Sequence, residues 1–147
     1  MSNKKQRIGI IGAGWWAAAM HIPTLVSNSS AEIAGICATD TDALKKVQDE
    51  FGISYGVTDY RQLLSEVDLD GVIISSPHTF HFEHAKAALE AGCHVLVEKP
   101  FTTDSKEAKE LIDLAAKKNL NLNVSHGWNY MPIAEKALKL MRADLIG

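Results

Sequence analysis

The amino-acid sequence predicts an α/β fold built on a doubly wound, parallel sheet of six strands. Six short apolar runs alternate with stretches of helical periodicity along the chain. The first run is rich in β-branched residues and passes directly into a glycine-rich turn. Because crossovers between parallel strands are right-handed, these elements are expected to give the strand order 3-2-1-4-5-6.

The elements follow one another with little to interrupt them. The expected strands are residues 7–11, 32–38, 54–57, 71–75, 94–97 and 121–126. The expected helices are residues 16–27, 41–51, 60–66, 77 to about 91, about 104 to 118, and an amphipathic helix after Pro132 that places Ala134, Ala137, Leu138 and Met141 on one face. Pro23 is expected to end or kink the first helix, and Gly52 and Gly92 to stop two others. Asp59 and either Thr103 or Asp104 are predicted N-caps.

The turn after the first strand reads Gly12-Ala13-Gly14-Trp15-Trp16-Ala17, which is the G-x-G-x-x-A pattern of a dinucleotide site. Gly12 allows the tight turn, and Gly14 lets the backbone approach a pyrophosphate. Ala17 lets the helix pack closely on the strand. One of the two indoles, Trp15 or Trp16, is expected to lie over the cofactor or to close the substrate side. In the alternative interpretation, one packs into the core and the other covers surface.

The end of the second strand indicates which nucleotide is bound. The position that reads the adenosine ribose is Ala38, which carries no charge, and Thr39 beside it can donate to a phosphate. This favours NADP over NAD, since an acidic side chain there would repel the 2′-phosphate. Asp40 and the lack of a nearby arginine argue for NAD, although Lys45 or Lys46 can supply a positive charge.

The end of the fourth strand supplies Ser75, Ser76 and Pro77, whose backbone and hydroxyl groups are expected to face the ribose and pyrophosphate. Ser76 and Pro77 also suit an N-cap and first-turn proline. Three histidines follow at intervals of three residues: His78, His81 and His84. No cysteine or carboxylate completes a metal-ligand set, so no metal site is predicted. His81 is expected to reach toward the nicotinamide, and His84 to be a packing or surface residue.

The fifth strand ends in Glu98-Lys99-Pro100, where a parallel sheet presents its ligand-binding edge. A lysine at such an edge can be held partly desolvated and take part in proton transfer. The alternative is a solvated loop with a turn proline.

Composition narrows the classes of function. At 147 residues the chain suits one domain, a dinucleotide-binding domain over residues 1–147. Its net charge of −3 gives no basic footprint, so nucleic acid is not an expected partner. The sequence suggests no signal peptide or membrane span, and Cys37 and Cys93 suit buried free thiols. A cytoplasmic protein is therefore expected.

These motifs together resemble the Gfo/Idh/MocA oxidoreductases. The matching segments are residues 8–14, 21–25 and 76–100. The resemblance implies a dehydrogenase acting on a sugar, cyclitol or related hydroxyl compound. It implies that Lys99 assists proton transfer beside the nicotinamide, that Glu98 contacts the cofactor, and that the peptide before Pro100 is cis.

The resemblance also implies a substrate domain after about residue 127, which completes the catalytic group and much of a homo-oligomer interface. Without that domain, no useful turnover and an exposed apolar patch are expected. Asn129 stands where many relatives have an arginine, which leaves the substrate contacts open. Two alternatives remain: a stand-alone, non-catalytic NAD(P)-binding sensor or partner module, and a different Rossmann enzyme such as a methyltransferase. Glu98-Lys99-Pro100 argues against the methyltransferase, since methyl transfer has no evident need for such a lysine.

Overall fold

The computed structural model describes residues 4–145 and confirms the doubly wound sheet. All strand pairs are parallel, and the order is β3-β2-β1-β4-β5-β6. The strands are β1 (Gln6–Ile11), β2 (Ala31–Cys37), β3 (Gly56–Val57), β4 (Gly71–Ile74), β5 (His94–Glu98) and β6 (Leu122–Ser125). Residues 1–3 and 146–147 of the predicted domain lie outside the described residues.

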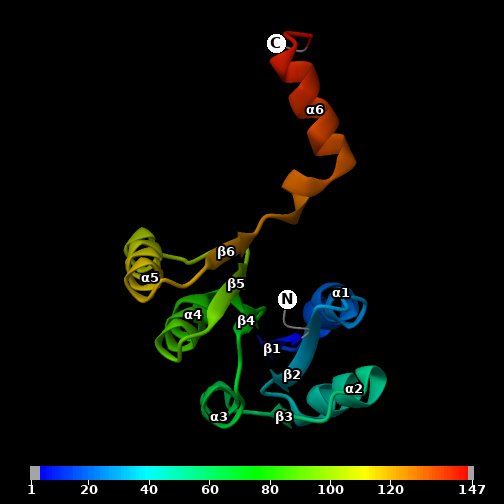
Figure 1. Ribbon diagram of the computed structural model, residues 1–147, viewed down its shortest axis with the longest axis vertical. Helices are drawn as coiled ribbons and strands as arrows, with labels where there is room; N and C mark the ends of the chain where they lie inside the picture. Colours follow the sequence, from blue (N-terminus) through cyan, green and yellow to red (C-terminus); the bar gives the residue numbers. More distant parts are fainter. Residues whose placement is uncertain (1–3, 146–147) are drawn as a thin grey trace.

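Helices cover both faces of the sheet, as Figure 1 shows. The helical segments are η1 (Ala17–His21), α1 (Ile22–Val26), α2 (Thr41–Phe51), α3 (Tyr60–Glu66), η2 (His78–Phe80), α4 (His81–Glu90), α5 (Ser105–Lys118), η3 (Gly127–Tyr130) and α6 (Pro132–Arg142). One buried cluster joins the sheet to η1, α1 and α2, and a second joins it to α3, α4 and α5. The alternation of apolar strands with amphipathic helices thus gives two cores, one on each face.

Both predicted N-caps are confirmed, and Asp40 provides a third that the sequence analysis does not predict. The Asp40 carboxylate accepts hydrogen bonds from the backbone N–H groups of Asp42 and Ala43 at 2.9 and 3.0 Å, which starts α2. Asp59 caps α3 in the same manner. Asp104, rather than Thr103, caps α5 by accepting from the N–H of Lys106 at 2.7 Å. These contacts satisfy amides that the first turn of a helix leaves without a partner.

Two helix starts differ from the sequence prediction. The helix expected over residues 16–27 begins at Trp15 and contains the π-helical turn η1, followed by α1. Pro23 lies within this continuous helical stretch, just after η1 and near the helix end at Val26. The helix expected directly after Pro77 begins with the 3₁₀ turn η2. Consequently the Ser76 hydroxyl does not cap it, and α4 begins only at His81.

The predicted last helix is present as α6, and Figure 1 shows it standing away from the sheet. None of its residues is buried. Large apolar side chains on η3 and α6 are exposed instead, namely Trp128, Tyr130, Met131, Ile133, Leu138 and Met141. The exposed apolar patch expected from the resemblance is therefore present on this segment. Within residues 4–145, no helix combines the length and apolar character that crossing a bilayer requires.

Candidate functional site

A cavity of about 500 Å³ lies at the carboxyl ends of β1, β2, β3 and β4. Strands β1 and β4 are neighbours in the sheet, while their following helices lie on opposite faces, so this is the topological switch point. The lining residues are Ile11, Gly12, Gly14, Trp15, Trp16, Cys37, Ala38, Thr39, Asp40, Ala43, Thr58, Tyr60, Ser75, Ser76, Pro77, Phe80 and His84. The volume suits a bound organic molecule.

The glycine turn forms one side of the cavity, and its two glycines differ in their surroundings. Gly12 has φ +90°, and a Cβ there would lie 2.3 Å from the backbone nitrogen of Ser76. Gly14 is open, because a Cβ there would meet no heavy atom within 4 Å. The N–H groups of Gly12 and Ala13 both donate to the Cys37 carbonyl at 2.9 Å, which ties the turn to β2. Gly12 thus serves the fold, while Gly14 leaves space at the cavity.

The end of β2 brings Ala38 and Thr39 into the cavity wall, as the sequence predicts. Asp40 also lines the cavity, but its carboxylate accepts from the first amides of α2. The neighbouring Cys37 thiol is buried. Its burial, which is the larger cause, and the negative charge of Asp59, which is the smaller, raise the pKa of Cys37 to about 11. The wall beside Ala38 therefore carries no free-standing acid directly after the strand.

The end of β4 contributes Ser75, Ser76 and Pro77 to the opposite wall. The Ser76 hydroxyl lies 2.9 Å from Nδ1 of His84. In the part of the chain that the structure describes, the Ser75 hydroxyl is the one buried side-chain oxygen or nitrogen without a hydrogen-bond partner. A polar group left unsatisfied beside an open cavity suits a site completed by a ligand.

The expected position of His81 requires correction, whereas His84 packs against aromatic rings as expected. His81 is fully buried and does not line the cavity. Its ring nitrogens lie 2.7 Å from the carbonyl oxygen of Pro100 and 2.9 Å from that of Ser76, so it joins the loops after β4 and β5. His84 lines the cavity instead. Burial lowers the pKa of His84, and the charge of Glu83 opposes this shift.

Sequence reasoning missed an aromatic end of the cavity. Phe80 and His84 stack with ring centroids 5.8 Å apart, and Tyr60 lies 4.4 Å from His84. The Tyr60 hydroxyl donates to Glu83 at 2.6 Å. Burial, followed by this hydrogen bond, raises the pKa of Tyr60 to about 12. Thr58 and Tyr60 follow the carboxyl end of β3, and this position was the available sequence signal.

Glu98 and Lys99 behave differently at the end of β5. Glu98 is buried, and its Oε1 accepts from Trp16 Nε1 at 3.0 Å and His21 Nε2 at 2.9 Å. Burial raises the pKa of Glu98, but hydrogen bonds from Trp16, Ser125 and the Lys99 amide outweigh this and hold it below its ordinary value. Lys99 is exposed among the described residues, so the end of β5 by itself does not shield it from water. The Lys99–Pro100 peptide is cis, as expected.

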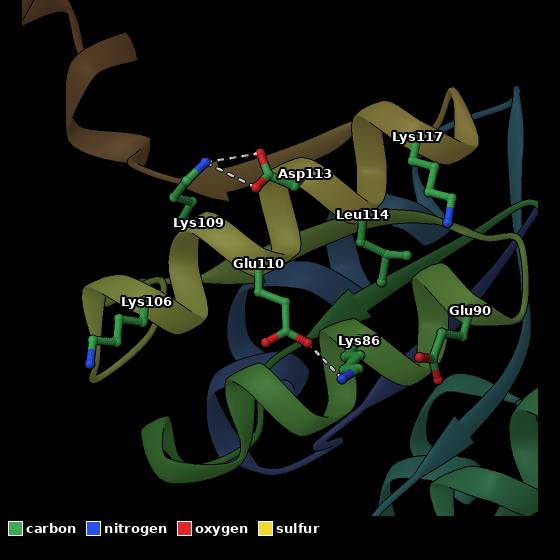
Figure 2. A pocket seen from close by; sticks show the side chains of 8 residues that line it. All are labelled: Lys86, Glu90, Lys106, Lys109, Glu110, Asp113, Leu114 and Lys117. Carbon is green, nitrogen blue, oxygen red and sulfur yellow. Dashed lines mark hydrogen bonds and ion pairs between the residues drawn. The ribbon is translucent and has the colours of Figure 1, made fainter.

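A second hollow, of about 570 Å³, lies between α4 and α5 (Figure 2). Charged side chains line most of it, and they include the ion pairs Lys86–Glu110 at 2.6 Å and Lys109–Asp113 at 3.0 Å. It contains none of the predicted site residues, and mixed surface charges of this kind are ordinary solvated faces. Among residues 4–145 no group of three or more His, Cys, Asp or Glu side chains is arranged to hold a metal ion.

The sheet topology, the open glycine and the cavity at the switch point together define a dinucleotide-binding domain of the Rossmann type. A dinucleotide fits these residues, because Gly14 leaves space for a pyrophosphate and the Ser75 hydroxyl lacks a partner beside it. Residues 6–126 match the model of the oxidoreductase family with an NAD-binding Rossmann fold, GFO_IDH_MocA. The chain belongs to this family of NAD(P)-binding oxidoreductases.

Individual relatives agree with this assignment. The chain is 33% identical to D-glucoside 3-dehydrogenase of Escherichia coli over 117 residues, which cover 80% of this chain and 33% of the relative. It is 31% identical to dTDP-3,4-didehydro-2,6-dideoxy-alpha-D-glucose 3-reductase of Actinomadura kijaniata over 141 residues, which cover 96% of this chain and 42% of the relative. The chain thus spans well under half the length of these curated relatives.

Solved structures give the same result. The crystal structure of myo-inositol 2-dehydrogenase from Lactobacillus plantarum superposes with a TM-score of 0.90 at 27% identity, covering 98% of this chain and 43% of that one. The 3-ketoreductase KijD10 from Actinomadura kijaniata, crystallised with NADP and TDP-benzene, also gives 0.90, at 30% identity, covering 98% and 44%. The match extends over nearly all of this chain.

Proposed function

We propose that this chain is the NADP-binding half of a dehydrogenase that transfers a hydride between a nicotinamide cofactor and a hydroxyl group of a sugar, cyclitol or related compound. The relatives' reactions on glucosides, keto-sugar nucleotides and inositol support this substrate class. The same dehydrogenase and reductase relatives favour an enzyme over a non-catalytic NAD(P)-binding module or a methyltransferase. We expect the contacts that select one substrate to lie beyond the dinucleotide cavity.

The observation that carries the proposal is the open position at Gly14 in the wall of the cavity. In this assignment Gly12 shapes the turn that brings the backbone to the pyrophosphate, Gly14 leaves space for the pyrophosphate, and Ala38 and Thr39 face the adenosine ribose. Ser75, Ser76 and Pro77 contact the sugar and phosphate groups on the other wall. Trp15 and Trp16 cover the cavity from the side of the glycine turn, where both line it. The aromatic end formed by Tyr60, Phe80 and His84 suits the planar adenine.

Ala38 is the reason to favour NADP over NAD. An acid at the end of β2 would repel a 2′-phosphate, and Ala38 carries none. The carboxylate of Asp40, two residues after Ala38, is held by two amides at the start of α2, whose dipole partly offsets its charge. NADP in the KijD10 crystal structure supports the same preference. Thr39 supplies a hydroxyl for the phosphate oxygens.

The nicotinamide, when bound, supplies the hydride acceptor or donor. Lys99 is the residue proposed to hold or release the proton of the substrate hydroxyl at its Nζ atom. Lys99 directly follows β5, and β5 pairs with β4, which is followed by the proposed cofactor contacts Ser75, Ser76 and Pro77. Because the Lys99 side chain is exposed, a further surface is required to exclude water from it. We propose that this surface packs against the exposed apolar side chains of η3 and α6. Glu98 is proposed to act on the site indirectly, since its side chain is buried and does not line the cavity.

The wider biological setting is also a proposal. We expect a small-molecule substrate, a homo-oligomer in the complete enzyme and a cytoplasmic location. The net charge of −3 supports the expectation that nucleic acid is not a partner.

Calorimetric titration of this chain with NADPH and NADH tests the nucleotide assignment. Saturable NADPH binding that is tighter than NADH binding supports it. Gly14→Asp is the control, because its side chain enters open space and places a negative charge where the pyrophosphate is proposed to lie. Loss of binding in a folded Gly14→Asp variant supports the site. Equal binding by the variant, or no binding of either nucleotide to the original chain, contradicts it.

A further inference from the structure

The helical segment after the glycine turn contains an unusual local geometry. In η1 the N–H of Ile22 donates to the carbonyl of Ala17, five residues back, which is a π-helical turn. In a regular α-helix, residues five apart point about 140° away from each other. A turn closed by a five-residue hydrogen bond instead brings such residues toward the same side. Trp16 and His21, five residues apart, both reach the same oxygen of Glu98.

The carboxylate of Glu98 links the side chains of Trp16 and His21 to the backbone of Lys99. Its Oε1 is shared by the indole N–H of Trp16 and Nε2 of His21, and its Oε2 accepts the backbone N–H of Lys99 at 3.1 Å. An ionised carboxylate only accepts, so Nε2 of His21 carries a hydrogen and donates it. The side chains of His21 and Glu98 are 13% and 9% exposed, so water has little access to compete for this contact. The position of the Trp16 ring is thus fixed at its N–H edge.

The face of that ring is turned to Lys99. The Lys99 Nζ atom lies 5.6 Å from the centroid of the Trp16 ring, within the range of a cation–π contact. Trp16 therefore meets both residues at the end of β5, with its edge on Glu98 and its face near Lys99. It also lines the nucleotide cavity. No other indole or phenyl ring among the described residues has this pair of contacts with Glu98 and Lys99.

We propose that Trp16 is a positioning residue for Lys99: Glu98 and His21 fix the indole ring, and the face of the ring, which also lines the cavity, holds the Lys99 ammonium. This proposal rests on the proposed function of Lys99 in proton transfer. A long lysine side chain in water samples many rotamers, and a fixed aromatic face limits that freedom before substrate arrives. The π-helical turn is the structural means, because it presents Trp16 and His21 together to one carboxylate.

NMR spectroscopy tests the position of the Lys99 side chain, because the ring current of an indole shifts the signals of groups that lie over its face. The chain is reductively methylated with ¹³C-formaldehyde, which keeps the charge of each lysine, and the Lys99 dimethylamino signal is assigned with Lys99→Arg. We expect this signal to lie upfield of the other lysine signals in the unsubstituted chain, because the methyl groups lie over an indole face. Trp16→Leu should return it to the position of a solvated lysine. An unshifted Lys99 signal in the unsubstituted chain, which requires no variant to fold, overturns the proposal.

Two further variants separate positioning from general damage to the fold. His21→Leu removes the donor to Glu98 and should reduce the upfield shift, whereas His21→Gln keeps an N–H donor and should restore most of it. Trp128→Leu is the matched control, because it removes an exposed indole on η3 and should leave the Lys99 signal unchanged. A full shift in His21→Leu, or an equal loss in Trp128→Leu, contradicts the proposal. The measurement needs no nucleotide, so a failure to bind NADPH refutes the proposed function separately.

Discussion

The two glycines of the turn after β1 should respond in opposite ways to the same substitution, Gly→Ala. At Gly12 the added Cβ would lie 2.3 Å from the Ser76 nitrogen and 2.5 Å from the Ser75 carbonyl carbon, with φ +90°. These are backbone atoms of the neighbouring strand end, so no side chain can rotate away. Backbone strain of about 1–3 kcal/mol and overpacking of about 1–3 kcal/mol give a loss of roughly 2–6 kcal/mol. This corresponds to a fall in Tm of roughly 5–20 °C for a domain of this size.

At Gly14 the added Cβ would meet no heavy atom within 4 Å, so the fold has no steric reason to weaken. The smaller entropy of the unfolded chain should stabilise it by about 0.4–1 kcal/mol, which is a rise in Tm of about 1–4 °C. The methyl group, however, enters the space proposed for the pyrophosphate. Loss of a charge-assisted contact of about 1.5–3 kcal/mol should weaken NADPH binding roughly 10- to 150-fold.

Thermal unfolding followed by circular dichroism, and calorimetric titration with NADPH, measure both quantities for both variants. The expected pattern is a destabilised Gly12→Ala and a stable Gly14→Ala with weak binding. A stable Gly14→Ala that binds NADPH as tightly as the original chain refutes the placement of the pyrophosphate. A Gly12→Ala with unchanged Tm refutes the steric argument.

Three further predictions concern charge. Ala38→Asp should weaken NADPH binding at least tenfold and leave NADH binding intact in parallel titrations, since two like charges about 4 Å apart repel by about 4 kcal/mol at an effective dielectric of 20. Because the pKa of Glu98 is lowered in the folded chain, its stabilising contribution is complete above the ordinary glutamate pKa of about 4.3 and is lost as pH falls through the folded-state value. The Tm of Glu98→Gln should therefore vary less with pH below about 5 than that of the original chain, and parallel curves would contradict this. With its pKa near 11, Cys37 is ionised in about one molecule in a thousand at pH 8, so iodoacetamide should label it slowly until urea unfolds the chain, as mass spectrometry would measure.

Local sequence signals were sufficient for most of the fold and for part of the site. Period and composition predicted each of the six strands, because buried parallel strands are short apolar runs flanked by turns. Asp59 and Asp104 were identifiable as N-caps, since their carboxylates act on amides two residues away. Gly12, Gly14, Ala38 and Thr39 were identifiable because the glycine pattern and the strand ends place them at one edge.

The errors arose where one turn changes geometry. The 3₁₀ turn η2 has three residues per turn, so the residues after Pro77 do not follow the helical wheel assumed for them. As a result His81 points to two backbone carbonyls and His84 to the cavity. The contact of His21 with Glu98 joins residues 77 positions apart through a π-helical turn. No local pattern in the sequence encodes such a contact, since both the turn and its distant partner must be known.

The proposed nucleotide site and the proposed proton-transfer residue lie in different parts of the structure. The cavity is formed entirely by the carboxyl ends of β1 to β4 and the segments that follow them, so the proposed dinucleotide contacts are all made by described residues. Lys99 is oriented by contacts with Trp16 but remains exposed, and in water a lysine gains no advantage for proton transfer. Substitutions at Gly14 or Ala38 should therefore act on nucleotide affinity. Substitutions at His21 should act on the placement of Lys99, and those at Trp16, which also lines the cavity, should act on both. The placement of Lys99 should affect a reaction rate only when a further surface excludes water from that lysine.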